Sequence, residues 1–564
     1  MSAAVYARLR VADPARWRGI ARAWRRWATL AGRLADRLHA DLVRLGTAWS
    51  GAAASAAVAR LTTLRRGLTV VRLLCWQADQ TASEFAAALD RAKRLLARAL
   101  AAAHRAGLTI DDEGRLRDAS APSAGPRTAH PAAAAPGTAT SGTPAPGAAA
   151  PGTPASGAPA RGPAATGAAI YAGPVAGDAI MAAQRATISA DLSAALTIAA
   201  RADDVAADRL AEIEGASRLP AQSPGPERPA CTATPAEVRR WWAALSPAER
   251  YWLLVTEPSW LAPLDGIPAA DRDAANRLLL DERRAELDQA LTSAPAGDRR
   301  RLRELRQGLD TLADRLDDDR GPRAYLLRLD LSEEGRVALA LGDPDRADNV
   351  VTHVPGMTAE LARFEGELSR AERVADRATE ISPAASTSAV LWLDYDAPDF
   401  VDEAASARRA EAGAPALRRF QDGLRADGSA RQTVIGHSYG SLVVGKAATS
   451  GFAADNVVFV GSPGVGVDSA RDLTGRVWAT TSLSDVIQYA APAPAAAARD
   501  LLLAPAFPAA ALPQKDLWFG HNPSDPAFGA HTFRSSPGAG HLGYWDQGSP
   551  SLDTMAAITL GTAR

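Results

Sequence analysis

The C-terminal half of the chain alternates short apolar runs with helical periodicity, and this alternation most limits the folds open to it. The runs are four to six residues long and rich in Val, Leu and Ala, which predicts buried strands. They cover residues 324–329, 336–341, 349–354, 389–393, 432–435, 456–460 and 476–480, with helices predicted at 359–377, 404–425 and 439–449. Strands that alternate with helices indicate an α/β fold, a doubly wound and mostly parallel sheet; the first two runs read as an antiparallel hairpin.

Residues 119–176 divide the chain. All but six of these 58 residues are Ala, Pro, Gly, Ser or Thr, and none is acidic. The prolines oppose a helix and few large apolar side chains are available for burial, so we expect a disordered linker. It would separate a helical domain at 1–118 from a helical arm and subdomain at 177–320, which precede an α/β domain at 321–564.

Two long helices are predicted before the linker. Apolar residues recur at helical spacing from Trp17 to Arg44 and again from about Ala52 to His104. Trp49-Ser50-Gly51 lies between them, so the helices should form an antiparallel hairpin. This arrangement resembles the WXG-motif proteins exported by type VII secretion systems, and the resemblance implies a helical protein partner. A plain hairpin whose Trp49 packs across the turn is the alternative.

The charge is unevenly distributed along the chain. Residues 1–118 hold 21 basic and 10 acidic residues, although the net charge of the whole chain is −1. The hairpin is thus basic and the rest of the chain is acidic, which suggests an anionic partner or docking within the chain. The simpler explanation of the basic excess is that these residues lie on ordinary solvent-exposed helix faces. Because the linker offers little to dock with, we expect the hairpin to be dispensable for activity.

Several classes of protein are excluded by composition and motifs. Two cysteines, Cys75 and Cys231, cannot form a disulfide framework or a cysteine-built zinc site. No apolar stretch approaches a membrane span and no signal-peptide core is present, so we expect a protein that is cytoplasmic or exported without a cleavable signal. Without a P-loop, a dinucleotide fingerprint or a His-Glu-x-x-His motif, we expect no cofactor, no metal and no nucleic acid.

Gly436-His437-Ser438-Tyr439-Gly440 lies where a predicted strand meets a predicted helix. This G-x-S-x-G pattern, in that context, is typical of a nucleophile elbow, a sharp turn that lifts a serine hydroxyl above the sheet edge. Gly436 and Gly440 allow the backbone to close the turn. Ser438 is therefore the candidate nucleophile, and a simple strand-to-helix turn without chemistry is the alternative.

A serine nucleophile needs a base and an acid, which follow it along the chain in this type of site. His437 neighbours Ser438 and should point away from it across the turn. Three histidines follow Ser438, and His541 lies in a glycine-rich loop before the last predicted helix, so it is the preferred base, with His521 next. Asp485 follows the strand at 476–480 and is the preferred acid. The competitors Asp468 and Asp472 precede that strand.

An oxyanion hole requires two backbone N–H groups that point at the developing charge. The residue after the nucleophile, Tyr439, supplies one. The loop after the strand at 349–354 would supply the other, with Gly356 giving close approach and Met357 donating. An ordinary Pro355-Gly356 turn is the alternative.

These motifs together resemble an actinobacterial α/β-hydrolase family catalogued as domain of unknown function 1023. The resemblance rests on Pro355-Gly356-Met357, on the stretch from Trp392 to Pro398, on 436–441 and on 540–551. It implies an α/β-hydrolase fold with a Ser438-Asp485-His541 site, and it implies no substrate. Asp394 and Asp396 belong to one of these motifs, which argues against reading them as a metal pair.

The motifs predict a metal-free serine hydrolase of carboxylesterase or lipase type that acts on a small-molecule or lipid ester. Amides and thioesters are the alternative bonds, because they share the acyl-enzyme chemistry. Residues 490–513 lie between acid and base and could form a lid or an acyl-binding wall, or a surface loop. The competing hypothesis is a secretion-linked interaction protein whose hairpin binds a partner, with the hydrolase fold secondary.

Overall fold

The computed structural model describes residues 3–118, 174–215, 227–318, 321–426, 428, 430–487 and 515–564. Most of the predicted linker at 119–176 and the whole predicted lid at 490–513 lie outside these ranges. The last three residues assigned to the linker, 174–176, instead begin a helix.

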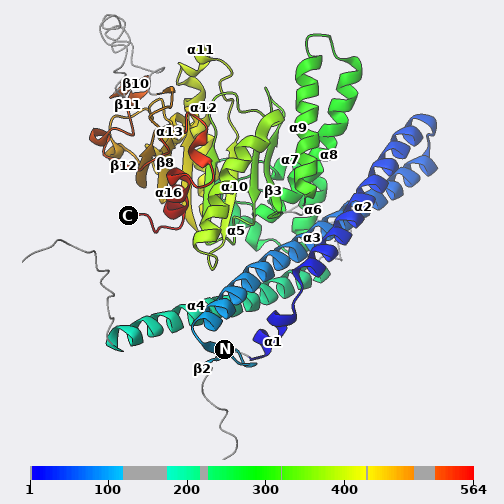
Figure 1. Ribbon diagram of the computed structural model, residues 1–564. Coiled ribbons are helices and arrows are strands. Elements are labelled where there is room, and N and C mark those ends of the chain that lie inside the picture. Colours follow the sequence, from blue (N-terminus) through cyan, green and yellow to red (C-terminus); the bar gives the residue numbers. More distant parts are fainter. Residues whose placement is uncertain are drawn as a thin grey trace, which may run out of the picture.

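A single eight-stranded sheet forms the centre of the α/β domain (Figure 1). Its strands are β3 (Ala324–Asp330), β4 (Arg336–Leu341), β5 (Asn349–Val354), β6 (Thr387–Leu393), β7 (Arg431–His437), β8 (Asn456–Val460), β9 (Arg476–Thr480) and β12 (His531–Thr532), in the spatial order β12-β9-β8-β7-β5-β6-β4-β3. Pairs from β6 to β12 are parallel, whereas β4 is antiparallel to both β3 and β6. The predicted α/β fold and its initial hairpin are confirmed.

Helices cover both faces of this sheet because the chain steps from β5 to β6 on one side and then passes back beyond β5 to form β7. Helix α10 (Phe364–Ile381) connects β5 to β6 and packs with α16 (Pro550–Thr559), while α12 (Arg408–Arg425) connects β6 to β7 and packs with α13 (Tyr439–Ala448). Right-handed crossovers in opposite directions place the two pairs on opposite faces. The central strands β5 and β8 are fully buried, as a sheet covered twice requires.

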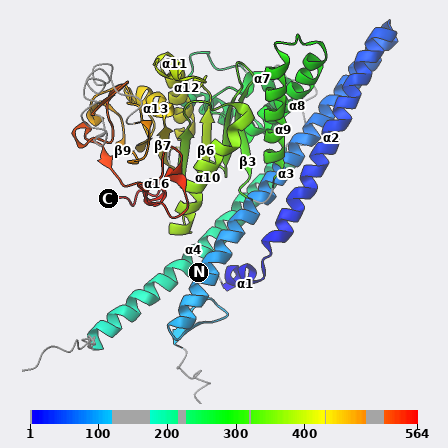
Figure 2. The same ribbon diagram turned by 45° about the horizontal axis from the view of Figure 1, so that its top comes forward.

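The N-terminal region consists of long helices that pack side by side (Figures 1 and 2). After α1 (Ala3–Val11), α2 (Pro14–Ala48) begins with Asp13 as its N-cap, and α3 (Ala52–Arg105) returns along it as the predicted hairpin. The short strands β1 (Leu108–Ile110) and β2 (Leu116–Asp118) follow. Helix α4 (Pro174–Gly215) then lies against α3, so the helical arm completes a three-helix layer.

A helical subdomain links this layer to the sheet. It contains α5 (Pro235–Ala244), α6 (Pro247–Thr256), α7 (Pro258–Leu261), α8 (Ala269–Ser293) and α9 (Arg299–Asp317). Capping boxes at Thr234 and Ser246 begin the first two helices. The subdomain shares one apolar core with the hairpin, in which Leu73 and Trp76 of α3 pack with Trp242 and Leu253.

Buried ion pairs also fix the hairpin to the rest of the protein. Asp79 of α3 is fully buried and accepts hydrogen bonds from Arg25 of α2 and from Arg323, which immediately precedes β3. Arg323 in turn reaches Asp273 of α8, which also holds Arg277. The hairpin is therefore not a separate domain, and docking within the chain, one of the explanations of its charge, is seen here through an acidic residue of the hairpin, Asp79, and a basic residue outside it, Arg323. That the hairpin is dispensable for activity stays a prediction.

The far half of the hairpin projects beyond the α/β domain (Figure 2). Trp27 is 60% exposed and Leu64 is 55% exposed, so the apolar stripe of the two helices is not buried within the hairpin. No helix among the described residues is long and apolar enough to span a membrane.

Candidate active site

Ser438 occupies a strained turn between β7 and α13. Its backbone has φ 53° and ψ −129°, and it is one of three non-glycine residues with positive φ in the described parts of the chain. Such a conformation costs about 1–3 kcal/mol and persists only where the surrounding structure imposes it. The Ser438 N–H donates to the Val460 carbonyl at the end of β8 (3.0 Å), which anchors the turn to the neighbouring strand.

The two elbow glycines are required by close backbone contacts. A β-carbon at Gly436 would lie 2.6 Å from the α-carbon of Ser441, and one at Gly440 would overlap the carbonyl oxygens of Val354 and Pro355. Any side chain at either position would therefore push the helix away from the strand or from the loop after β5. The G-x-S-x-G spacing thus has a steric origin in this structure.

Asp485 and His541 lie together at the same edge of the sheet, where the turn after β9 meets the loop before α16. The His541 Nδ1 is 2.9 Å from Oδ1 and 3.0 Å from Oδ2 of Asp485. Asp485 is fully buried and also accepts hydrogen bonds from the Ile487 N–H (2.9 Å) and the Tyr544 hydroxyl (2.5 Å). The imidazole of His541 is about one quarter exposed, so the pair can reach a bound molecule.

The competing histidines are engaged elsewhere. His521 places its Nδ1 3.0 Å from Asp516, and its backbone N–H donates to Asp468, which removes that aspartate from consideration as well. His531 is exposed on β12 and its ring lies 4.7 Å from the ring of Trp478. Of the three histidines after the elbow, His541 is the one held by the predicted acid.

Gly461 follows β8 and makes room for the acid–base pair. Its φ is +55°, and a β-carbon there would lie 2.7 Å from Oδ2 of Asp485 and 3.3 Å from Cε1 of His541. Sequence reasoning missed this position, although a glycine directly after a buried central strand is a signal of close approach.

A stack of imidazoles supports His541 from the inside of the protein. The ring of His437 lies 4.8 Å from that of His541, and its Nε2 donates to the His541 carbonyl (2.9 Å). Burial, together with the charges of His541 and Arg370, lowers the pKa of His437 well below its usual value, so His437 is neutral. Sequence reasoning placed this side chain away from the site, whereas it fixes the backbone of the candidate base.

Behind His437 lies His353, whose Nε2 is 2.9 Å from Glu367. Burial lowers the pKa of His353 as well, although the Glu367 carboxylate opposes that shift. Two neutral rings therefore separate His541 from the charged surface of α10. A positive charge that forms on His541 meets no competing charge on its imidazole neighbours.

The loop after β5 lies directly against the nucleophile. A β-carbon at Gly356 would be 2.7 Å from the Ser438 β-carbon and 3.0 Å from the Tyr439 nitrogen. The Tyr395 hydroxyl donates to the Pro355 carbonyl (2.7 Å) and holds this loop in place. Met357 follows Gly356 directly, so its N–H belongs to the loop that lies against Ser438 and Tyr439, the first residue of α13. This loop could therefore supply a second backbone donor to the site.

Asp394 and Asp396 are each occupied by an arginine. Arg328 contacts Asp394 at 3.2 Å, and Arg409 pairs with Asp396. Within the described ranges no three His, Cys, Asp or Glu side chains gather closely enough to hold a metal ion.

Comparison with known proteins agrees with this fold. A family model described as alpha/beta hydrolase matches residues 330–495, which include Ser438 and Asp485. The uncharacterized protein Rv2079 of Mycobacterium tuberculosis is 30% identical over 370 residues, or 58% of this chain and 55% of that protein. The uncharacterized proteins Mb0988c of Mycobacterium bovis and Rv0963c of M. tuberculosis are each 31% identical over 186 residues, which cover 31% of this chain and 68% of theirs.

The chain therefore spans about half the length of the first of these relatives and two thirds of the others. No solved structure matches it significantly.

Proposed function

Because the chain belongs to an α/β-hydrolase family with mycobacterial members, we propose that it is a serine hydrolase that cleaves a carboxylic ester through Ser438, Asp485 and His541. The observation that carries the proposal is the joint placement of a serine in a strained elbow and a histidine held by a buried aspartate. A strain of this kind, kept beside an acid–base pair, is typical of a nucleophile rather than of a structural serine.

In the proposed reaction each residue has one role in acyl transfer. His541 accepts the Ser438 proton as the serine oxygen attacks the ester carbonyl, and Asp485 holds the imidazole in the tautomer that presents Nε2 to the serine. The backbone N–H groups of Tyr439 and Met357 stabilise the oxyanion of the tetrahedral intermediate. The alcohol leaves with the proton of His541, and water then hydrolyses the acyl-enzyme by the same route.

Apolar side chains beside these residues favour an ester with an apolar acyl group. Leu483 and Val486 on either side of Asp485 are each 65% exposed, and Leu542 next to His541 is 60% exposed. Met357 and Phe400 are also exposed in the loops after β5 and β6. An apolar chain that covers these side chains gains about 25 cal/mol for each Å² of apolar surface removed from water.

The test is covalent labelling with a fluorophosphonate probe, together with hydrolysis of p-nitrophenyl acetate and p-nitrophenyl octanoate. The wild-type chain should become labelled at one serine, and Ser438→Ala should abolish both labelling and hydrolysis. Ser332→Ala, which removes an exposed hydroxyl in the turn after β3, is the matched control and should change neither.

His541→Ala should likewise abolish hydrolysis, whereas His521→Ala should leave it nearly unchanged. A wild-type chain that neither reacts with the probe nor turns over either ester contradicts the proposal. That result would favour the competing hypothesis, in which partner binding by the hairpin is the main function.

A further inference from the structure

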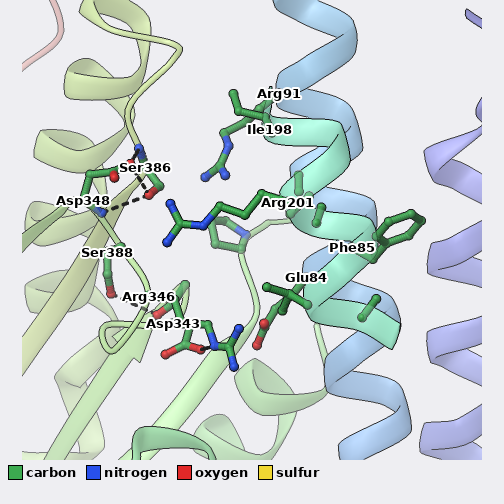
Figure 3. A pocket seen from close by; sticks show the side chains of 18 of the residues that line it. Glu84, Phe85, Arg91, Ile198, Arg201, Asp343, Arg346, Asp348, Ser386 and Ser388 are labelled. Carbon is green, nitrogen blue, oxygen red and sulfur yellow. Dashed lines mark hydrogen bonds and ion pairs between the residues drawn. The ribbon is translucent and has the colours of Figure 1, made fainter. Parts of the chain in front are cut away.

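A cavity of 620 Å³ lies between the helical layer and the sheet (Figure 3). One wall is formed by α3 and α4, and the other by the loop between β4 and β5 and the start of β6. The cavity is open to solvent on one side, since Arg201 and Asp348 in its lining are exposed. Three segments that are distant in the sequence therefore meet around one space.

This cavity is separate from the candidate active site. Asp348 and Ser386 in its lining lie just before β5 and β6, whereas Ser438 comes directly after β7. Because β5, β6 and β7 are parallel, the beginnings and the ends of these strands lie at opposite edges of the sheet. A ligand in the cavity would not touch the Ser438 site.

The lining has more positive than negative side chains. It includes five arginines and three carboxylates: Arg91, Arg201, Arg209, Arg323, Arg346, Glu84, Asp343 and Asp348. Arg209 pairs with Glu84 and Asp343, and Arg346 also contacts Asp343. Arg323 is used by the ion pairs that dock the hairpin.

Arg91 of α3 and Arg201 of α4 are left without such partners. Both side chains extend into the cavity, and their guanidinium groups face the same space (Figure 3). Within the described part of the chain, neither makes a hydrogen bond or an ion pair, and the Nε of Arg91 is buried without an acceptor. Burial lowers the pKa of Arg91, and the negative charge of Asp348 opposes that shift. This is expected for a guanidinium that nearby carboxylates neutralise only in part.

Asp348 does not neutralise the two arginines directly. Its Oδ2 accepts hydrogen bonds from both the N–H and the hydroxyl of Ser386, each at 2.7 Å, and this pairing links the segments that lead into β5 and β6. The carboxylate is thus held at the sheet edge. The space in front of Arg91 and Arg201 remains open to an anion from outside.

We propose that this cavity binds a phosphomonoester, with the phosphate held between Arg91 and Arg201 and the organic part against the wall of α3 and α4. Two guanidinium groups match the two negative charges of a phosphomonoester near pH 7, and each can form paired hydrogen bonds to its oxygens. Ala88, Ala194 and Ile198 supply an apolar surface next to these charges. A carboxylate would neutralise only one of the two cations.

Such a ligand would join the hairpin to the arm. Its phosphate contacts Arg91 of α3 and Arg201 of α4, and its organic part contacts both helices. A ligand that binds only the packed arrangement of α3 and α4 stabilises that arrangement by mass action. Binding should therefore raise the melting temperature of the full chain without changing the access of an ester to Ser438.

The test is isothermal titration calorimetry of the full chain with phenyl phosphate, inorganic phosphate and benzoate, alongside thermal unfolding. Phenyl phosphate should bind most tightly and raise the melting temperature. Arg201→Gln should weaken its binding at least about tenfold, because a charge-assisted hydrogen-bonding partner is lost. Arg201 is exposed, so this substitution should leave folding intact, and Arg91→Gln should have a similar effect on binding.

Arg94→Gln is the matched control, since it removes an exposed charge from the same helix outside the cavity lining and should leave binding within about twofold. The proposal is overturned if the wild-type chain binds no phenyl phosphate at about 10 mM. It is equally overturned if Arg201→Gln binds as well as Arg94→Gln, or if benzoate binds more tightly than phenyl phosphate. None of these readouts depends on ester hydrolysis, so the result is independent of the proposed function.

Discussion

Asp79→Asn is the substitution that tests most directly how the hairpin is held. Asp79 is fully buried and receives hydrogen bonds from Arg25, Arg323 and Ser83. Burial alone would raise the pKa of Asp79, but the two arginines outweigh it and hold the pKa below its usual value. The ionised carboxylate is therefore the favoured form, and asparagine leaves two buried guanidinium groups without its charge.

Loss of one partner from a buried ion pair costs about 3–5 kcal/mol, because the remaining charge stays out of water. Arg323 keeps Asp273 as a second partner, so we expect the lower end, about 3 kcal/mol. If the hairpin detaches as a unit, a loss of about 3 kcal/mol lowers the protection of its buried amides against hydrogen exchange by about two orders of magnitude.

Native-state hydrogen exchange, read on peptides from 70–86 of α3, measures this protection. Asp112→Asn is the control, since it breaks an exposed pair with Arg10 at 2.8 Å and should change protection by no more than a few-fold. Because the folded pKa of Asp79 is depressed, its contribution is present above the unfolded pKa of about 3.9 and is lost as the pH falls below it. An Asp79→Asn protein with wild-type protection in α3 at pH 7 refutes the reasoning.

Three further predictions concern the candidate site and the helical subdomain. Ser438→Ala and His541→Ala should each reduce kcat by on the order of 10³-fold or more, and the double variant by no more than the worse single one; multiplicative losses in steady-state assays would contradict a joint role. Tyr544→Phe removes one donor from the Asp485 carboxylate and should lower kcat/KM by roughly tenfold or more with little change in KM, whereas a pure KM effect would argue against it. Asp271→Asn should stabilise the protein by about 2–3 kcal/mol at pH 7, because burial raises the pKa of Asp271 to about 6. That gain grows as the pH rises from about 4 to 6, where the unfolded carboxyl is already ionised, and melting temperatures that do not converge at low pH would refute it.

Seven of the eight strands of the sheet could be predicted because their signals are local, whereas the two-residue strand β12 was not predicted. Apolar runs such as Asn349–Val354 are buried from end to end, and the elbow at Ser438 combines a strand, two glycines and a helix within a short segment. Chain order then led to Asp485 and His541, which the structure places within hydrogen-bonding distance. Their roles in catalysis remain a proposal.

The remaining parts of the site depend on contacts between distant segments. Tyr544 and Gly461 act on Asp485 from positions 59 and 24 residues away in sequence, and neither carries a catalytic pattern of its own. His437 was set aside because it neighbours the nucleophile, yet the fold brings it onto the His541 backbone. No spacing rule predicts such contacts before the loops have been placed.

Docking of the hairpin within the chain was one explanation of its charge, but the residues that make the contact could not be predicted, for a related reason. Charged residues on a long helix usually face solvent, and the low-complexity segment suggested a free domain. Asp79, however, shares a helical face with the buried residues Cys75, Ala82 and Ala86. An acidic residue within an apolar stripe is a signal of a buried partner, but the sequence does not say which arginine supplies it.

The ion pair between Asp79 and Arg323 also sets the order in which the protein can be completed during synthesis. The two residues are 244 positions apart, and the ribosome adds about 5–20 residues per second. Arg323 is therefore added to the chain roughly 12–50 s after Asp79. Over most of that interval Leu73 and Trp76 also await the core supplied by residues 238–279. The first helices to leave the ribosome are thus among the last to be covered, and a fragment that ends before residue 238 exposes both the Asp79 carboxylate and an apolar face that the finished protein hides.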